Sequence, residues 1–251
     1  MADLRPRRRR RRQEGAVYVE FLVAFPIMLM FFLCLIQLGL IYTANLSVEH
    51  AATRAARAAV VVLPDDPERY DGDPIHRIDP EPAEPSSAPG SLGTILEVIT
   101  ALAHNSDDRM DVIRRAAWIP LIPISPSTNA LTREFTVRNS LDSGAAKVAA
   151  SALYASASTA VTFYAEPEST EMIWDFEPRQ EITTRVTHLY YCSVPLARMV
   201  ICRSLADAEE DAPVRAELVQ APGRILSLWS GRFLALRAES TMPNQGAAYA
   251  W

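Results

Sequence analysis

Residues 15–42 read GAVYVEFLVAFPIMLMFFLCLIQLGLIY, and this stretch decides the architecture of the chain. From Phe21 onward it is apolar, with Gln37 the one strongly polar side chain before Tyr42. As a helix, residues 16–41 would be about 39 Å long, enough to cross a bilayer core of about 30 Å with some tilt. The segment is too long for the apolar core of an ordinary cleaved signal peptide, so we expect a single-pass membrane anchor.

A run of basic residues precedes this apolar segment. It consists of Arg7, Arg8, Arg9, Arg10, Arg11 and Arg12, with Arg5 just upstream. Positive charge next to an apolar span holds that end of the helix in the cytoplasm, so we expect the C-terminal part of the chain outside it. Basic runs also bind nucleic acid, but the position of this one beside an apolar span favours a topology signal.

The junction between the arginines and the helix is Gly15-Ala16-Val17-Tyr18-Val19-Glu20-Phe21. A glycine after a basic leader, a carboxylate five residues later and then uninterrupted apolar residues resemble a type IV prepilin cleavage site. Together with Pro26 early in the helix, this layout resembles the TadE/TadF-like minor pilins, or pseudopilins, of the Tad/Flp pilus system. The resemblance implies a prepilin-type leader that a prepilin peptidase cleaves between Gly15 and Ala16.

Glu20 is the one carboxylate at the start of the apolar segment, and a carboxylate is costly inside a bilayer. The resemblance implies an assembly role for Glu20, with Phe21 beside it, in which the carboxylate neutralises the free N-terminal amine of a neighbouring subunit. The alternative is that Glu20 snorkels to the cytoplasmic headgroups and has no partner.

The sequence divides into five parts. We expect a leader at 1–15, a transmembrane helix at 16–42, a helical extension at 43–63, a proline-rich linker at 64–90 and an extracytoplasmic domain at 91–251. The extension is rich in alanine, which suits either close approach of neighbouring helices or a solvated stalk.

The expected fold class is α+β, with a long N-terminal transmembrane helix followed by a pilin-like domain that holds a small antiparallel sheet and extra helices. Three segments predict strands: Val161–Tyr164, Ile182–Tyr191 and Phe233–Met242. In the second strand Ile182, Thr184, Val186, His188 and Tyr190 share a face. Helices are predicted from the capping box at Thr94, from Asp107 or Asp108 to Pro120, and over 143–159.

Cys192 and Cys202 are the two cysteines outside the apolar segment, where Cys34 is most simply an apolar filler. In an oxidising compartment they favour a disulfide over free thiols or a metal site. Between them lies a mostly apolar stretch that we expect to form a helical turn begun by Pro195.

Charge and motifs argue against other functions. The chain has a formal net charge of −5, and without the basic leader it is still more acidic, which disfavours nucleic acid as a partner. We find no phosphate-binding loop, no dinucleotide fingerprint and no hydrolase or metalloprotease motif, so we expect no enzyme activity, cofactor, metal or small-molecule substrate. His188 is more simply a packed residue than a metal ligand.

The sequence therefore predicts a minor pilin or pseudopilin precursor in the cytoplasmic membrane. Its expected partners are the prepilin peptidase, the pilus assembly platform, other pilins and the lipid bilayer. The alternative is a single-pass anchored envelope protein that binds a partner outside the cytoplasm and never enters a pilus.

Overall fold

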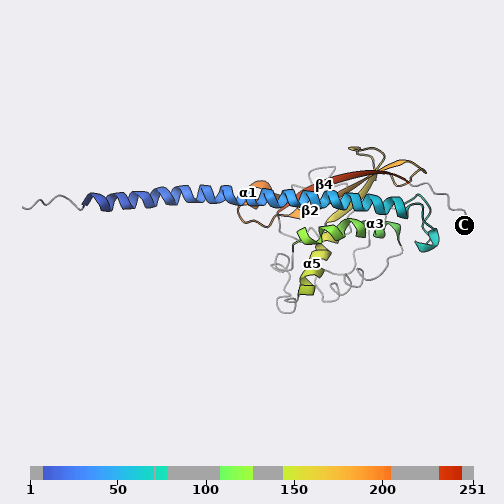
Figure 1. Cartoon of the computed structure of the whole chain (residues 1–251), viewed down its shortest axis with the longest axis horizontal. Helices are drawn as coiled ribbons and strands as arrows, with labels where there is room; N and C mark the ends of the chain where they lie inside the picture. Colours follow the sequence, from blue (N-terminus) through green and yellow to red (C-terminus); the bar gives the residue numbers. More distant parts are fainter. Residues whose placement is uncertain (1–7, 71, 79–107, 127–143, 205–231, 245–251) are drawn as a thin grey trace, which may run out of the picture.

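The computed structural model describes residues 8–70, 72–78, 108–126, 144–204 and 232–244. One long helix dominates it: α1, Arg8–Val62, has 55 residues and is about 82 Å long (Figure 1). Pro26 lies inside α1 without ending it, and Pro64 follows its last turn. The predicted leader, membrane segment and extension therefore share one helix over the part that the structure describes.

A four-stranded antiparallel sheet lies along the C-terminal half of α1 (Figure 1). The strands are β1 (Thr159–Tyr164), β2 (Glu181–Tyr191), β3 (Arg203–Ser204) and β4 (Arg232–Pro243), in the order β1-β2-β4-β3. Val186 of β2 pairs with Val161 of β1 and with Ala238 of β4. The predicted α+β class and the three predicted strands are confirmed, and the two-residue β3 was not predicted.

Three α-helices and two 3-10 turns complete the described chain. They are η1 (Pro67–Arg69), α3 (Arg109–Trp118), η2 (Ile119–Ile124), α5 (Gly144–Ala157) and α6 (Ala197–Ile201). Asp108 caps α3 by accepting a hydrogen bond from the Met110 N–H at 3.1 Å, as the sequence predicted. The helix predicted at Thr94 lies outside the described residues. We call the sheet together with α3, α5 and α6 the C-terminal domain.

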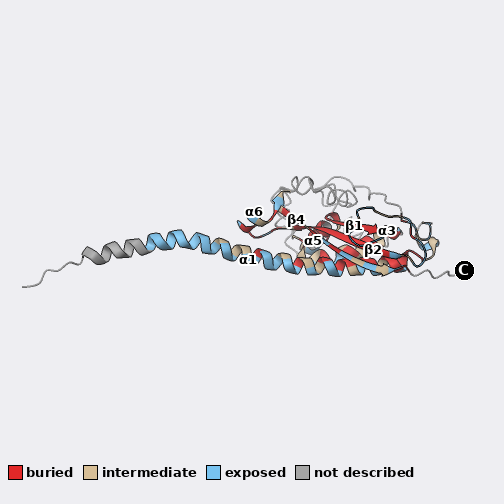
Figure 2. Ribbon diagram, turned by 90° about the horizontal axis from the view of Figure 1, so that it is seen from above, coloured by how far each residue is buried: buried red, intermediate tan, exposed pale blue. Residues whose placement is uncertain are grey.

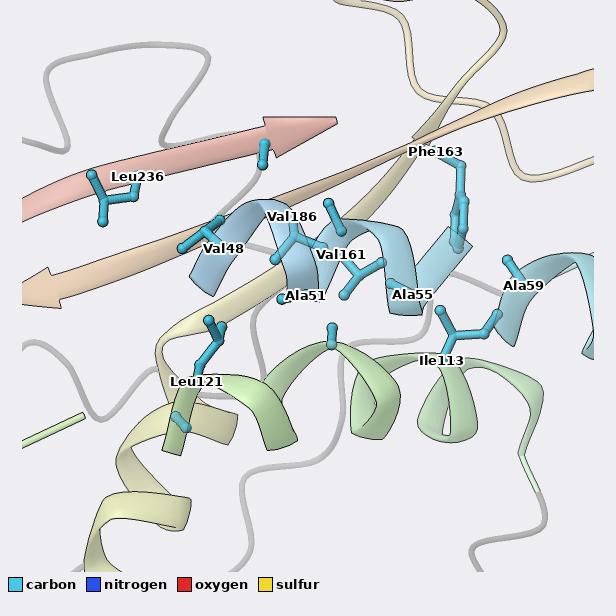
Figure 3. Close-up of a cluster of buried hydrophobic side chains, with 14 of the residues drawn as sticks. Val48, Ala51, Ala55, Ala59, Ile113, Leu121, Val161, Phe163, Val186 and Leu236 are labelled. Atoms are coloured by element: carbon cyan, nitrogen blue, oxygen red, sulfur yellow. The ribbon is translucent and has the colours of Figure 1, made fainter. Parts of the chain in front are cut away.

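The core lies between α1, the sheet and α3 (Figure 3). The predicted face of β2 is the one that packs here, because Ile182, Val186 and Tyr190 join the core cluster. The opposite face of β2 is buried too, so the alternating pattern does not mark a solvent-exposed side. On that face the Arg185 guanidinium lies 2.6 Å from the Glu239 carboxylate on β4.

The alanines of the helical extension face this core. The fully buried ones are Ala44, Ala51, Ala52, Ala55 and Ala59. Their short side chains let the α1 backbone approach both the sheet and α3 closely, as Figure 3 shows around Ala51 and Ala55. The close-approach interpretation therefore holds within the chain itself, and the interpretation as a solvated stalk is wrong.

The first part of the predicted linker folds against the domain. The His76 N–H donates to the Leu63 carbonyl at 3.0 Å, and the Ile78 N–H donates to the Trp174 carbonyl at 2.9 Å. Prolines here fix turns rather than a free extended chain, as at Pro67, which opens η1. Residues 64–70 and 72–78 are thus part of the folded unit, in contrast to the expectation of an extended linker.

Candidate membrane anchor and assembly site

The N-terminal half of α1 carries apolar side chains that the rest of the described chain does not cover. Every residue from Tyr18 to Leu29 is exposed, and the exposed band continues to Ile36 with partial cover (Figure 2). The most apolar window of the helix has a mean hydropathy of 2.6 and is 0% buried. The core helix of a soluble protein would bury such a window, so α1 has the properties of a single-pass membrane anchor.

Gln37 is the first residue of this band that the domain covers, while Leu38, Leu40 and Tyr42 beyond it are still exposed on the other side of the helix. The Gln37 side chain is fully buried, and its Oε1 accepts a hydrogen bond from the Val194 N–H at 3.2 Å. From Tyr18 to Tyr42 the helix would be about 37 Å long, enough to cross a hydrocarbon core of about 30 Å. The predicted membrane segment extends to Tyr42, but the domain already contacts the helix from Gln37 onward.

The predicted cleavage and assembly residues all lie on α1. Gly15 and Ala16 lie within the helical backbone, and Arg8 to Arg12 form its first turns, while Arg7 lies outside the described residues. Glu20 and Phe21 are exposed, and the Phe21 ring stacks on that of Phe25 with centroids 5.3 Å apart. Cleavage and assembly remain predictions.

The disulfide between Cys192 and Cys202 is present, with Cα atoms 6.6 Å apart. Cys192 directly follows β2, and its N–H donates to the Arg232 carbonyl at 3.0 Å. Between the cysteines α6 forms the predicted helical turn, but it starts at Ala197 and not at Pro195, because Leu196 between them has a positive φ of 64°. The bridge therefore closes a small loop at the end of β2, beside α1.

Loss of either bridged cysteine should destabilise the protein by about 2–3 kcal/mol, because closing a loop of about 11 residues restricts the unfolded chain. We expect Cys192→Ser and Cys202→Ser to shift the urea midpoint of the full-length protein in micelles equally, and Cys34→Ser to leave it unchanged. Thiol titration of the denatured, non-reduced protein should find Cys34 alone. Three reactive thiols in that titration would contradict the bridge.

A buried guanidinium holds the C-terminal end of α1, and the sequence did not reveal it. Arg109 begins α3 and is fully buried. One terminal nitrogen donates to the backbone carbonyls of Val62 and Leu63. The other donates to the backbone carbonyls of Asp65 at 2.9 Å and Asp73 at 3.2 Å. The last carbonyls of a helix have no partner within it, and a cation there also complements the helix dipole. Arg109 therefore fastens α1 to the domain.

The histidine on β2 is a packed residue, as the sequence favoured. His188 is fully buried, with its Nδ1 2.9 Å from the Thr159 hydroxyl and 3.3 Å from the Ser158 hydroxyl. Burial lowers the pKa of His188 to about 3, so the ring is neutral at physiological pH. No group of three or more metal-ligating side chains occurs among the described residues.

An open depression of about 440 Å³ lies between the loop at 74–77 and the loop at 175–180. His76 and Asn244 adjoin it, with the His76 Nδ1 3.1 Å from the Asn244 Nδ2. Its walls hold Arg77 and Asp175, an exposed pair 3.7 Å apart. A shallow site with one solvated ion pair gives no reason to assign a bound cofactor.

Comparison with known proteins agrees with the geometry of α1. Residues 15–57 match the family model described as TadE-like protein. The match begins at Gly15, runs through the exposed apolar band and ends on the buried alanine segment, so it lies entirely on α1. No curated protein and no solved structure matches the chain. The resemblance predicted from the sequence is confirmed over residues 15–57, which are similar to TadE-like proteins.

Proposed function

We propose that this protein is a minor pilin or pseudopilin precursor of the Tad type. The observation that carries the proposal is the coincidence at residue 15: the TadE-like match begins at the glycine that ends the basic leader. An exposed apolar helix then follows, with Glu20 as its one carboxylate before Gln37. In the proposal the peptidase removes residues 1–15, and the chain acts as a substrate and structural component rather than as an enzyme.

The continuity of α1 supports a mechanical role. The apolar band up to Ile36 is free to pack laterally, first in the membrane and then against other pilins. From Gln37 the same helix is built into the C-terminal domain, and Arg109 fixes its far end. Any displacement of the helix along its axis therefore moves the domain with it. Such a unit would help to initiate or cap a fibre together with the assembly platform and other pilins.

The proposed location is the cytoplasmic membrane, with the N-terminus in the cytoplasm and the domain outside. Arg8 to Arg12 precede the span and support this orientation by their charge. The Cys192–Cys202 disulfide supports it independently, because such bonds persist in oxidising compartments.

Processing should depend on Gly15. We expect Gly15→Val to block cleavage almost completely while leaving membrane insertion intact, because the arginines that set topology are unchanged. A gel of membrane fractions would then show a precursor larger than the mature form by residues 1–15. Val17→Ala, two residues beyond the junction, is the matched control and should be processed normally. Cleavage of Gly15→Val at the wild-type rate would contradict the proposal.

Assembly should depend on Glu20. Glu20→Leu is expected to insert at least as well as wild type, because a carboxylate costs about 2.5–3.5 kcal/mol at the bilayer centre and less near its edge. Its pili should nevertheless be few, because the amine of a neighbouring Ala16 would lack its counter-charge. Glu20→Asp keeps the charge and should restore part of the count of pili by electron microscopy. Normal pili in the Glu20→Leu strain would favour the snorkelling interpretation.

A further inference from the structure

The turn between the bridged cysteines carries an apolar surface that the domain leaves open. Leu196, Met199 and Val200 are 49%, 60% and 67% exposed. On the inner side Ala197 is buried and Ile201 packs against the core. The turn is therefore anchored on one side and presents three large apolar side chains on the other.

This apolar surface lies beside α1 at the level of Gln37, the first residue of the exposed band that the domain covers. α6 contacts α1, and the Val194 N–H is bonded to Gln37. Figure 2 shows α6 at the end of the domain nearest the exposed half of the helix. The exposed apolar side chains continue past Gln37 to Leu38, Leu40 and Tyr42, so a bilayer that covers them brings its domain-side boundary to the level of Gln37 or just beyond it. The turn beside Gln37 therefore lies at the same boundary.

The polar groups of the turn are compatible with this depth. Arg232 donates to the carbonyls of Met199 at 3.3 Å and Cys202 at 3.1 Å, so two acceptors at the end of α6 are paired. Residues 192–204 contain Arg198 and Arg203 and no acidic side chain. Arginines beside an apolar surface suit the layer of anionic lipid headgroups.

We propose that Leu196, Met199 and Val200 insert into the interfacial layer of the bilayer on the domain side, as a second membrane contact beside α1. A single helix leaves the domain free to rotate and tilt over the membrane. A second contact, held in shape by the disulfide, fixes its height and orientation. The inference rests on α1 spanning a membrane and does not require entry into a pilus.

The test places a fluorescent side chain on the turn. Val200→Trp is compared with Val61→Trp, a matched control that is 63% exposed near the far end of α1. That control lies about 36 Å from Gln37 along the helix. Each full-length variant is reconstituted in phosphatidylethanolamine–phosphatidylglycerol vesicles, with or without lipids brominated near the headgroup end of the acyl chains. The emission of wild type is subtracted to remove the native tryptophans.

An interfacial side chain buried about 5–10 Å below the headgroups should contact bromine, so we expect the added Val200→Trp emission to fall by about half. The Val61→Trp emission should not change. Met199→Trp provides a second probe, and thiol titration of each variant reports that the disulfide has formed. Equal quenching at residues 200 and 61 would overturn the proposal. So would emission at residue 200 that shifts with protein density but not with bromolipid, because that result assigns the turn to a neighbouring copy.

Cleavage after Gly15, measured beside bromolipid quenching, separates this inference from the proposed function. Replacing Met199 and Val200 together with serine should abolish the membrane contact while leaving cleavage after Gly15 unchanged. Bromolipid quenching in a protein that is never cleaved would support the membrane contact and contradict the pilin proposal. Normal cleavage without bromolipid quenching would support the pilin proposal and contradict the membrane contact.

Discussion

Arg109→Met is expected to lower the free energy of unfolding by about 3–5 kcal/mol, because four carbonyl oxygens at and just beyond the end of α1 lose the guanidinium as a donor. The loss stays below the sum of about 1–3 kcal/mol for each, because Leu63 keeps the N–H of His76 and water replaces part of the rest. Arg109→Lys should lose less stability, because lysine keeps the positive charge, although it lacks the planar set of donors of a guanidinium. Urea unfolding of the full-length protein in micelles, followed by near-ultraviolet circular dichroism, measures both.

Arg69→Met is the control for this experiment. Arg69 lies in η1 with 67% of its side chain exposed, 3.5 Å from the Asp65 carboxylate. An exposed ion pair contributes about 0–1 kcal/mol, so this variant should resemble wild type. If Arg109→Met were no less stable than Arg69→Met, the guanidinium would not be what fastens the helix.

The second large effect is a loss of stability in mild acid that depends on His188. Its folded pKa of about 3 lies below the usual value of 6.5, so the neutral ring stabilises the folded state above pH 6.5. As the pH falls below 6.5 the unfolded chain binds a proton that the folded chain does not. Stability is then lost at about 1.4 kcal/mol per pH unit, or about 3 kcal/mol by pH 4.5, until the folded ring also titrates.

The measurement compares unfolding of wild type and His188→Gln from pH 7 to pH 4.5. Burial beside Asp73 raises the pKa of Asp108 to about 6. The pH dependence of stability from Asp108 is therefore opposite to that from His188, because the stabilisation by the protonated carboxyl is lost as the pH rises through about 6. Because this contribution is common to both proteins, the difference between them isolates His188. His50→Gln replaces an exposed histidine on α1 and is the matched control for the substitution. Parallel curves for wild type and His188→Gln would refute the assignment.

The local part of the fold could be predicted from the sequence because its signals are local. An apolar run before Gln37, a proline at residue 64 and the period-two pattern in β2 each act over one element. The disulfide could be predicted from the number of cysteines, because two of the three lie outside the membrane segment. The TadE-like resemblance depended on the residues around Gly15.

Long-range contacts could not be predicted in this way. Arg109 reaches carbonyls 46 and 47 residues away, and Gln37 meets Val194 across 157 residues. No periodicity links such positions, so neither contact was predicted. The alanine face was read as either helix packing or a stalk, because an alanine pattern alone does not identify the surface that covers it.

The central claim is that the chain becomes a pilin subunit by losing its leader. N-terminal sequencing of the protein purified from native envelopes tests this claim most directly, because it reads the cleavage position itself. We expect the mature chain to begin at Ala16, with Val17 and Tyr18 following. A mature protein that keeps the arginines before Gly15, or that begins beyond the apolar segment, would contradict the account.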